Sequence, residues 1–411
     1  MPDPILAFSM PQFIASMTVI FIVINLALVA AAYFILLERR IAGWVQDRLG
    51  PNRVGPLGLF QPIADGLKLL LKEDYLPRGA DRPLFILAPA LSMMVAMIAF
   101  AIIPWAGALD LSTLPFTDSL SGSVKMMGAD VNIGIIYLIA VTSLGVYGVT
   151  LGGWSSNNKY SFLGGLRASA QMVSYEIPMG LALLCVILTA GTVRADQIVS
   201  QQIEGQWFLI HQPLAAVLFY TCMLAEANRA PFDLAEAEQE LVGGWHTEYS
   251  SMKWAMFFLG EYIHVFVGSA FFTVLFLGGW SLNPLFGYDL PLAGGIWMIL
   301  LQFGIVLGKV LFMVILTMVV RWTLPRFRFD QLMRLAWEGM IPAGLLLLLV
   351  TSFFIFLGWS ASLWLGSIAA LAIILLVYPW LPRQANPNHR VGMYGSRFSP
   401  APEDRQAAVG E

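Results

Sequence analysis

Residues 225–250 read AEANRAPFDLAEAEQELVGGWHTEYS and lie between two long apolar segments. The stretch holds a single Lys or Arg, Arg229, and six carboxylates: Glu226, Asp233, Glu236, Glu238, Glu240 and Glu248. Clustered carboxylates raise one another's pKa, and partial burial acts in the same direction. The stretch is therefore a candidate set of groups that exchange protons near neutral pH. A solvated acidic loop, or carboxylates paired with arginines elsewhere in the chain, fits the same residues equally well.

The composition around this stretch is that of a polytopic membrane protein. Of the 411 residues, 58% are hydrophobic and only 12% are charged, whereas an average soluble domain is about a quarter charged. A bilayer core needs about 20 apolar residues per helix. We therefore predict an all-α fold with about nine transmembrane helices, at residues 14–37, 84–105, 131–152, 166–190, 207–226, 254–280, 292–320, 339–359 and 361–381.

The basic residues predict the orientation of these helices. The linkers 38–83, 153–167, 227–253 and 321–338, with the tail after 381, hold 20 of the 23 Lys and Arg residues. All five lie on one side if nine helices alternate, and the positive-inside rule assigns that side to the cytoplasm. The N-terminus is then outside and the C-terminus cytoplasmic. We expect one transmembrane domain over 1–381, including the acidic cytoplasmic loop 226–250, and an irregular cytoplasmic tail over 382–411.

Residues 61–74 are predicted to form an interfacial helix. Its charged and apolar residues fall on opposite faces, with Asp65, Lys68 and Lys72 on one and Ile63, Leu67 and Leu70 on the other. Such a helix lies in the membrane interface with its apolar face toward the lipid. A helix that only anchors the chain would show the same pattern. The residues between Glu38 and this helix are rich in Gly and Pro and are not expected to form a long helix.

Ionisable residues inside the apolar segments are the other candidates for chemistry. Groups at that depth are costly, and they usually line a pathway or pair with one another. Glu176 and Glu261 are interpreted as members of a proton path, with an internal ion pair as the alternative. Lys309 fits a structural partner of a carboxylate equally well. His264 could join Glu261, although a lone His on an apolar helix is more often a packing residue.

The two cysteines, Cys185 and Cys222, predict no redox centre. Both lie in apolar runs and form no CxxC motif or Cys/His cluster. Iron–sulfur centres need several thiolates. We therefore expect no metal site, no covalently bound cofactor and no redox centre in this chain.

Four segments together resemble one family. They are ERRIAGWVQDRLGPNRVGP (38–56) with FQPIADGLKLLLKE (60–73), RASAQMVSYE (167–176), the stretch 225–250, and RWTLPRFRFDQLM (321–333). In order and spacing they resemble the H subunit, also called subunit 1, of proton-pumping NADH:quinone oxidoreductase, respiratory complex I. The resemblance covers Ile14 to Gly358, and the ninth segment and the tail lie beyond an eight-helix family core.

The resemblance implies a membrane subunit that forms the lower part of a quinone chamber at the foot of a peripheral arm. In the family, the first helix, the interfacial helix and the sixth helix frame the opening for quinone, which corresponds here to 14–37, 61–74 and 254–280. The residues that match positions on or beside the chamber are Arg39, Arg48, Arg53, Phe60, Asp65, Phe232 and Asp233.

The resemblance also implies a proton path from the chamber toward antiporter-like subunits. The matching residues are Glu176, Glu226, Glu236, Glu238, Glu240, Glu248 and Glu261. The substrate would be ubiquinone or menaquinone, which the residues do not distinguish. FMN and the iron–sulfur clusters would reside in partner subunits only. The other expected partners are small membrane subunits, peripheral-arm subunits and membrane lipids, with no nucleic acid, in a bacterial plasma membrane.

Two other interpretations fit parts of the sequence. Membrane-bound hydrogenases and deazaflavin-dependent dehydrogenases contain a related protein as an ion-coupling anchor, although GPNRVGP and RASAQMVSYE look nearer the complex I version. A stand-alone secondary transporter would also have broken helices and charges at mid-membrane. Its two halves should show an internal repeat, and none is evident in the sequence.

Overall fold

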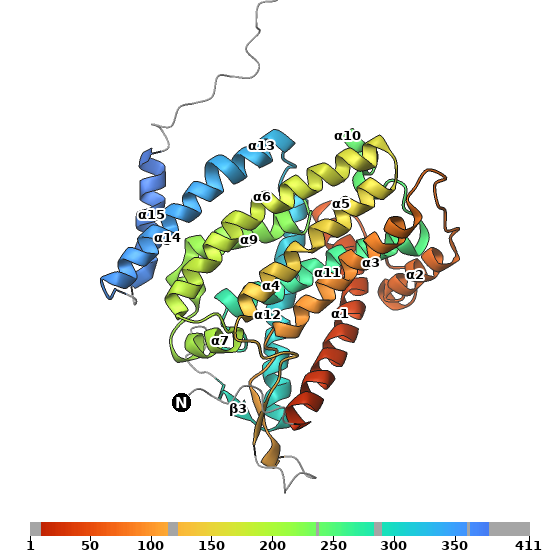
Figure 1. The fold of residues 1–411 in the computed structure, drawn as a ribbon. Coiled ribbons are helices and arrows are strands. Elements are labelled where there is room, and N and C mark those ends of the chain that lie inside the picture. The colour runs from red at the N-terminus through yellow and green to blue at the C-terminus, as the bar shows by residue number, and fades with distance from the viewer. Residues whose placement is uncertain (1–9, 114–121, 236–237, 283–289, 360–361, 378–411) are drawn as a thin grey trace, which may run out of the picture. The chain divides into compact units, whose positions relative to one another are not determined.

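The computed structural model of the chain describes residues 10–113, 122–235, 238–282, 290–359 and 362–377 (Figure 1). The chain divides into two compact units, residues 1–370 and 371–411. Of the second unit the described part holds only residues 371–377, the end of helix α15. The tail predicted at 382–411 therefore lies outside the described residues, and the account below concerns the first unit.

Seven helical stretches of the described residues are long and apolar enough to cross a membrane: α1 (Met10–Val45), α3 with its 3-10 extension (Arg82–Ile102), α4 with α5 (Gly134–Ser155), α6 (Lys159–Ala190), α11 (Ser251–Phe276), α12 (Ile296–Thr323) and α13 through α14 (Phe329–Phe356). Two shorter apolar helices, α9 (Pro213–Glu226) and α15 (Leu363–Val377), fall in the remaining predicted segments. The mostly helical membrane fold is confirmed. Nine spans and the orientation of the termini remain predictions.

The shorter elements lie between these helices. The bounds within the compound stretches are α3 (Arg82–Ala99), η2 (Phe100–Ile102), α4 (Gly134–Ser143), α5 (Gly145–Ser155), α13 (Phe329–Arg334), the π-helix η5 (Leu335–Met340) and α14 (Ile341–Phe356). The other helices are η1 (Pro56–Gly58), α2 (Gln61–Leu71), η3 (Leu111–Thr113), α7 (Ala195–Glu204), α8 (Phe208–His211), α10 (Glu238–Leu241) and η4 (Gly244–His246).

Two boundaries near the N-terminus differ from the sequence prediction. α1 continues through Glu38 to Val45, and the returning chain packs closely against it at Gly43. A Cβ at Gly43 would lie 2.8 Å from the carbonyl oxygen of Arg48, closer than real Cβ atoms approach. α2 ends at Leu71 instead of residue 74, because Lys72 already has an extended backbone.

A small sheet departs from the predicted all-α fold. Strands β2 (Ser123–Lys125), β1 (Ala108–Asp110) and β3 (Ala293–Gly294) pair in that order, β1 running antiparallel to β2 and parallel to β3. Pairing satisfies backbone groups of the connecting loops. The side chain of Gln12 in α1 both donates to the backbone oxygen of Lys125 and accepts from its backbone nitrogen, at 3.2 and 3.0 Å. It therefore ties α1 to the edge strand β2.

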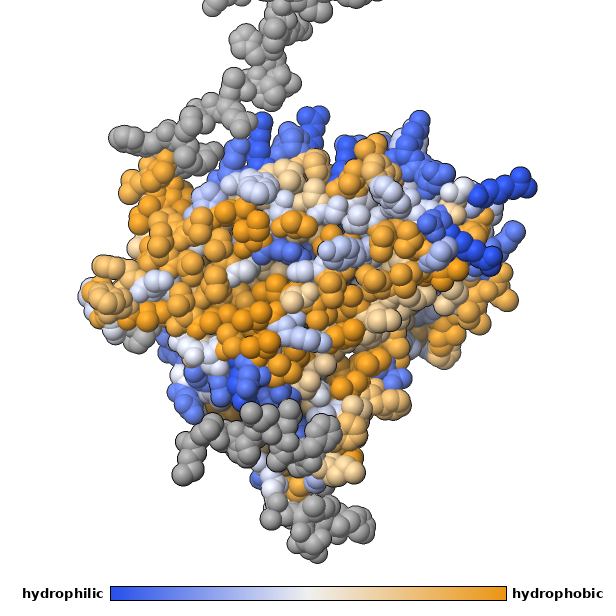
Figure 2. All heavy atoms as spheres, in the orientation of Figure 1, coloured by the Kyte–Doolittle hydropathy of each residue, from blue (hydrophilic) through white to orange (hydrophobic). Residues whose placement is uncertain are grey.

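The two ends of the helices carry different features. We call the end with the linkers 38–83, 153–167, 227–253 and 321–338 the basic end, and the end with β1, β2 and β3 the sheet end. Figure 2 shows hydrophobic side chains over the middle of the first unit and hydrophilic ones toward both ends. This distribution is the one expected of helices that cross a bilayer.

α11 is the central helix of the first unit. Within its most apolar window 72% of the residues are buried, whereas none of the other long helices exceeds 50%. In a bilayer, helices associate through close packing and small residues. Gly148 of α5 meets α3 at such a contact, since a Cβ there would lie 2.9 Å from the backbone nitrogen of Ser92. Because α11 is the most buried of the long helices, its polar residues lie inside the bundle.

An ion cluster joins two loops at the sheet end. Lys125 contacts Asp130 at 2.8 Å and Asp196 at 2.6 Å, and Arg194 contacts the same two carboxylates at 2.7 and 3.3 Å. Lys125 and Arg194 are two of the three basic residues outside the basic linkers. Burial opposes ionisation of Asp196, but the hydrogen bonds and charges of Lys125 and Arg194 outweigh it and lower the pKa of this carboxyl.

Asp196→Asn should destabilise the chain by about 1–2 kcal/mol, because hydrogen bonds to charged groups contribute that order of magnitude. A carboxyl whose pKa is lowered by folding contributes its full stability above its unfolded pKa of about 3.9 and loses it only as the pH falls through the folded pKa. The difference from wild type should therefore stay constant between pH 5 and 8. It can be measured by thermal melting in detergent with a thiol-reactive dye, because Cys185 and Cys222 are fully buried.

The matched control is Glu204→Gln, which changes an exposed carboxylate on the same helix, α7. It should leave the melting temperature unchanged. A difference for Asp196→Asn that shrinks toward pH 5 would contradict the lowered pKa.

Candidate functional site

A buried carboxylate, Glu38, joins three helices at the basic end. The extension of α1 carries Glu38 beyond the predicted span, and the residue is 6% exposed. Arg321, near the end of α12, forms an ion pair with it, and Tyr262 of α11 donates a hydrogen bond to Glu38 Oε2 at 2.6 Å. A buried charge requires such partners, because its desolvation costs several kcal/mol. The set fixes α1, α11 and α12 to one another.

A second buried ion pair lies beside the first. Arg229, from the loop after α9, is 4% exposed, and its Nη2 lies 3.1 Å from Oε2 of Glu261. Its guanidinium also lies 4.2 Å from the ring centroid of Tyr262. Tyr262 thus contacts both pairs, through its hydroxyl and through its ring. The ion pair that was the alternative for Glu261 is present, although an ion-paired carboxylate can still belong to a proton path.

Two larger cavities flank these pairs. The first, which we call the mouth cavity, has a volume of about 160 Å³ and lies between α1, α2 and α11. Its wall is mostly apolar, with Arg39, Gln61 and Asp65 as polar members. The second, the polar cavity, has a volume of about 510 Å³, and its charged lining residues are Asp233, Glu261, Arg321 and Arg326. Phe258 lines both cavities.

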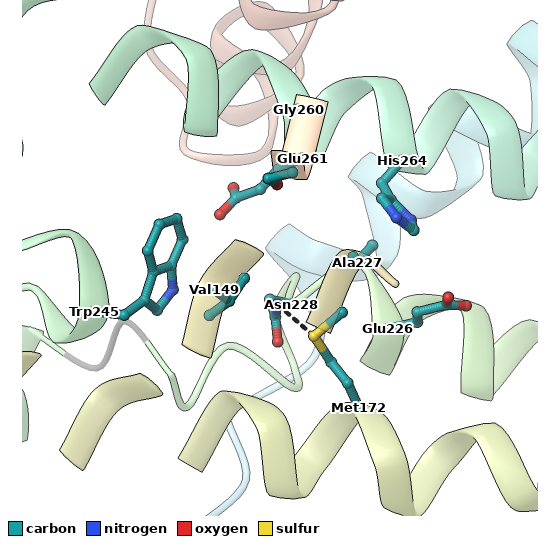
Figure 3. A pocket seen from close by; sticks show the side chains of 11 residues that line it. Val149, Met172, Glu226, Ala227, Asn228, Trp245, Gly260, Glu261 and His264 are labelled. Carbon is teal, nitrogen blue, oxygen red and sulfur yellow. Dashed lines mark hydrogen bonds between the residues drawn. The ribbon is translucent and has the colours of Figure 1, made fainter. Parts of the chain in front are cut away.

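Two small cavities of about 20 Å³ each continue inward from the polar cavity. Glu261, Glu226 and His264 line the first of them, which we call the inner cavity (Figure 3). Glu226 and His264 also line the second, the deep cavity, together with Thr142. A site of this size holds about one water molecule if polar partners are present. The four cavities therefore form a series in which each shares at least one lining residue with the next.

Glu226 is the carboxylate at the inner end of this series, and Glu176 of α6 interacts with it from outside the residues that line the four cavities. Glu226 is the last residue of α9, and 9% of it is exposed. Its Oε1 and the Oε1 of Glu176 are buried and accept no hydrogen bond from the described residues. The two carboxylates are close enough for their charges to interact. Glu226 and Glu261 thus line one cavity, and Glu176 interacts with Glu226. That these three carboxylates form a proton path stays a prediction.

The other acidic residues of the predicted proton path lie elsewhere. Glu240 is exposed and pairs with Arg167 at 2.6 Å, and Glu248 accepts a hydrogen bond from Asn158 Nδ2 at 2.6 Å. Glu240 thus has the alternative of pairing with an arginine elsewhere in the chain, whereas the partner of Glu248 is an asparagine. Glu236 lies outside the described residues, and for Glu238 only its backbone, at the start of α10, is described.

The predicted quinone-chamber residues fall into two groups. Arg39 and Asp65 form an ion pair of 2.7 Å at the mouth cavity, and Asp233 pairs with Arg326 at 2.8 Å in the polar cavity. The remaining residues line none of these four cavities. Arg48, Arg53 and Phe60 are exposed, and Phe232 is buried in a ring stack with Phe327 at 5.5 Å. Whether any of them contacts quinone stays a prediction.

Sequence reasoning missed most of the buried charge network. Glu38 was assigned to a linker, because the Gly- and Pro-rich segment after it suggested that the helix had ended. Arg321 and Arg229 were counted only as basic linker residues, and Tyr262 carries no charge that would mark it. A signal was present in the sequence, because two of the apolar segments end directly beside residues of opposite charge, Glu38 in one case and Arg321 in the other.

Lys309 is held by two backbone carbonyl groups and an aromatic ring, which fits a structural role. Its Nζ donates to the backbone oxygens of Leu277 and Ser281 at 2.6 and 2.5 Å and lies 4.4 Å from the ring centroid of Trp207. The first of these oxygens follows the C-terminus of α11, where a cation is stabilising. Among the described residues no group of three or more His, Cys, Asp or Glu is arranged to hold a metal ion.

The comparisons with known proteins agree with one another. The profile of the NADH dehydrogenase family matches residues 17–352. An H subunit (H 1) of NADH-quinone oxidoreductase from Cytophaga hutchinsonii is 43% identical over 80% of this chain and 93% of its own length. NADH-quinone oxidoreductase subunit 8 of Rhodothermus marinus is 47% identical over 79% and 92%. A second H subunit (H 2), from Geobacter metallireducens, is 45% identical over 84% and 97%.

Arg321→Gln should destabilise the chain by about 3–5 kcal/mol, because it leaves Glu38 buried without its countercharge. Adding Glu38→Gln should restore much of that loss, since the double variant buries no charge at this point. Thermal melting of the two single variants and the double variant gives the coupling between the residues.

The matched control is the pair Arg39–Asp65, whose arginine side chain is 45% exposed. Arg39→Gln should cost less than about 1 kcal/mol, as exposed pairs do. Equal losses for Arg321→Gln and Arg39→Gln, or additive effects of Arg321→Gln and Glu38→Gln, would contradict the buried pair.

Proposed function

The chain belongs to the NADH dehydrogenase family, and from that premise we propose that it forms the lower end of the quinone chamber and the first part of the proton path of NADH-quinone oxidoreductase. It is a membrane subunit of that complex, as its relatives are. The match to this chain covers 93% and 92% of the lengths of the first two relatives named above. The proposal concerns what this subunit contributes to the activity of the complex.

The series of four cavities is the single observation that carries the proposal. The mouth cavity is mostly apolar and lies beside the interfacial helix α2, which suits a quinone that arrives from the lipid. The polar cavity follows, sharing Phe258 with the mouth, and the inner and deep cavities lead on to Glu226. An apolar opening and a carboxylate-lined interior thus lie next to one another within one bundle.

The chemistry of quinone reduction needs both ends of this series. Reduction of a quinone to a quinol consumes two electrons and two protons, and the electrons come from redox centres in partner subunits. The reaction creates negative charge or a demand for protons beside the polar cavity. Closely interacting sites respond to such a change as a group, because their titrations are coupled. Arg321, Arg326 and Asp233 are the charges that face the cavity on its quinone side.

The buried pairs provide a route for that response. Arg321 holds Glu38, Tyr262 contacts both Glu38 and Arg229, and Arg229 holds Glu261. A change in charge in the polar cavity beside Arg321, which itself stays protonated, therefore alters the field at Glu261 through contacting residues. From Glu261 the path runs to Glu226 and Glu176. Glu236, Glu238, Glu240 and Glu248 are assigned to the loop that faces partner subunits, where reordering changes the contacts at Arg167 and Asn158.

The location of the protein follows from the same proposal. It lies in a bacterial plasma membrane with its basic end toward the cytoplasm, where the peripheral-arm subunits with FMN and iron–sulfur clusters dock. Small membrane subunits continue the path from Glu176. The names of the three relatives described above give no support to a hydrogenase anchor or a stand-alone transporter.

Gly66→Phe should narrow the mouth cavity and raise the KM for a long-tailed quinone by about tenfold, equivalent to about 1.4 kcal/mol. A Cβ at Gly66 meets nothing within 4 Å, so the ring has room to enter the cavity without breaking α2. Reduction of a short-tailed quinone should change less, because its tail occupies less of the mouth. Both rates can be measured in membranes that contain the assembled complex.

The control is Leu67→Phe, the next residue of α2, which is exposed and lies outside the mouth cavity. It should leave both KM values unchanged. If Gly66→Phe alters neither quinone, or alters both quinones equally, the mouth cavity is not the opening for the quinone tail.

A further inference from the structure

His264 lines the same two small cavities as Glu226, but the proton path proposed above gives it no role. It lies on α11 three residues after Glu261, so both side chains leave the same face of the helix. Figure 3 shows its imidazole pointing from α11 toward the level of Glu226 on the facing helix. His264 and Glu226 are the two residues that line both the inner and the deep cavity.

Two polar atoms at these cavities lack hydrogen-bond partners among the described residues. Nε2 of His264 is buried and has no hydrogen bond to any described residue, and the same holds for Oε1 of Glu226. A buried polar atom without a partner costs about 1–3 kcal/mol. Water molecules in the two cavities would satisfy both atoms, because each cavity of about 20 Å³ has room for one.

We propose that His264 carries protons between Glu261 and Glu226, through one water molecule in the inner cavity and one in the deep cavity. The inference rests on the proposed proton path and adds a residue to it. The imidazole accepts a proton at one ring nitrogen from the Glu261 side and releases the proton of its other ring nitrogen toward Glu226. One proton enters and one leaves, so the residue is neutral again after each transfer, and rotation of the ring restores the starting tautomer.

The charges that act on His264 are few and come from known elements. Among the described residues, Glu226 of α9 and Glu261 of α11 are the only charged ones that line the inner cavity with it, and Glu226 alone lines the deep one. Two further charged residues act on His264 through these carboxylates. Arg229 pairs with Glu261, and Glu176 of α6 interacts with Glu226. The lining residues from α3, α4 and α5 carry no charge. A transient imidazolium would thus lie between two carboxylates.

His264→Gln is the principal test, because an amide of similar size still binds water but does not carry a proton. We expect assembly of the complex to be unchanged, shown by NADH oxidation with an artificial acceptor, and proton pumping in vesicles to fall at least about tenfold, equivalent to about 1.4 kcal/mol. The solvent deuterium isotope effect on turnover should rise, because proton transfer becomes limiting. A merely structural role of His264 would not raise that isotope effect.

Gly145→Ala is a second variant that leaves every titratable group in place. A Cβ at Gly145 would lie 3.4 Å from Nε2 of His264 and 3.8 Å from Val95, in ordinary contact, and would occupy space in the inner cavity. We expect slower pumping with normal assembly. The control is Ser269→Ala, which removes a buried hydroxyl of α11 that lines none of the four cavities. This variant should pump as wild type.

Glu226→Gln separates this inference from the proposed function. If Glu226→Gln pumps normally, the proposed path itself fails. If Glu226→Gln stops pumping while His264→Gln pumps at the wild-type rate with an unchanged isotope effect, the path stands and the role of His264 is overturned. If His264→Gln assembles poorly, Gly145→Ala decides, and pumping at the wild-type rate in that variant overturns the inference.

Discussion

The pairing of Glu38 with Arg321 is the constraint on which the rest of the site depends. Charges at the edge of a bilayer core are costly unless they are paired. Here the pair holds the ends of α1 and α12 together, and Tyr262 fastens α11 to the same carboxylate. Glu261 and His264 lie on α11, which is the most buried of the long helices. Fixing the position of α11 therefore also fixes these two residues.

The network separates two environments within a short distance. On one side, the mouth cavity is bounded by apolar residues and the ion pair Arg39–Asp65 at its rim. On the other side, the inner and deep cavities offer carboxylates and room for single water molecules. The pair Arg229–Glu261 lies at the boundary, since Arg229 contacts Tyr262 and Glu261 lines both the polar and the inner cavity. A hydrophobic substrate and a proton path can therefore meet without a continuous open channel of water.

Much of the fold, and part of the site, could be predicted from the sequence. The apolar segments located the helices, because period and length are sufficient for that purpose. Glu176, Glu226 and Glu261 stood out as charges in or at the end of such segments; Glu226 and Glu261 line one cavity, and Glu176 interacts with Glu226. The end of α1 was placed too early, because the Gly- and Pro-rich segment after Glu38 suggested that the helix had ended. The partners of Glu240 and Glu248 depend on long-range contacts that no spacing in the sequence reveals.

The measurement that tests the account most directly is the number of protons pumped per NADH oxidised by the complex with Tyr262→Phe. This change removes one oxygen, the hydroxyl that donates to Glu38, and retains the ring that Arg229 contacts. If the buried network couples the quinone chamber to Glu226, quinone reduction should continue in uncoupled vesicles, while the ratio of protons to electrons measured in coupled vesicles falls. A ratio equal to that of the wild type, at full turnover, would contradict the role of the network in coupling.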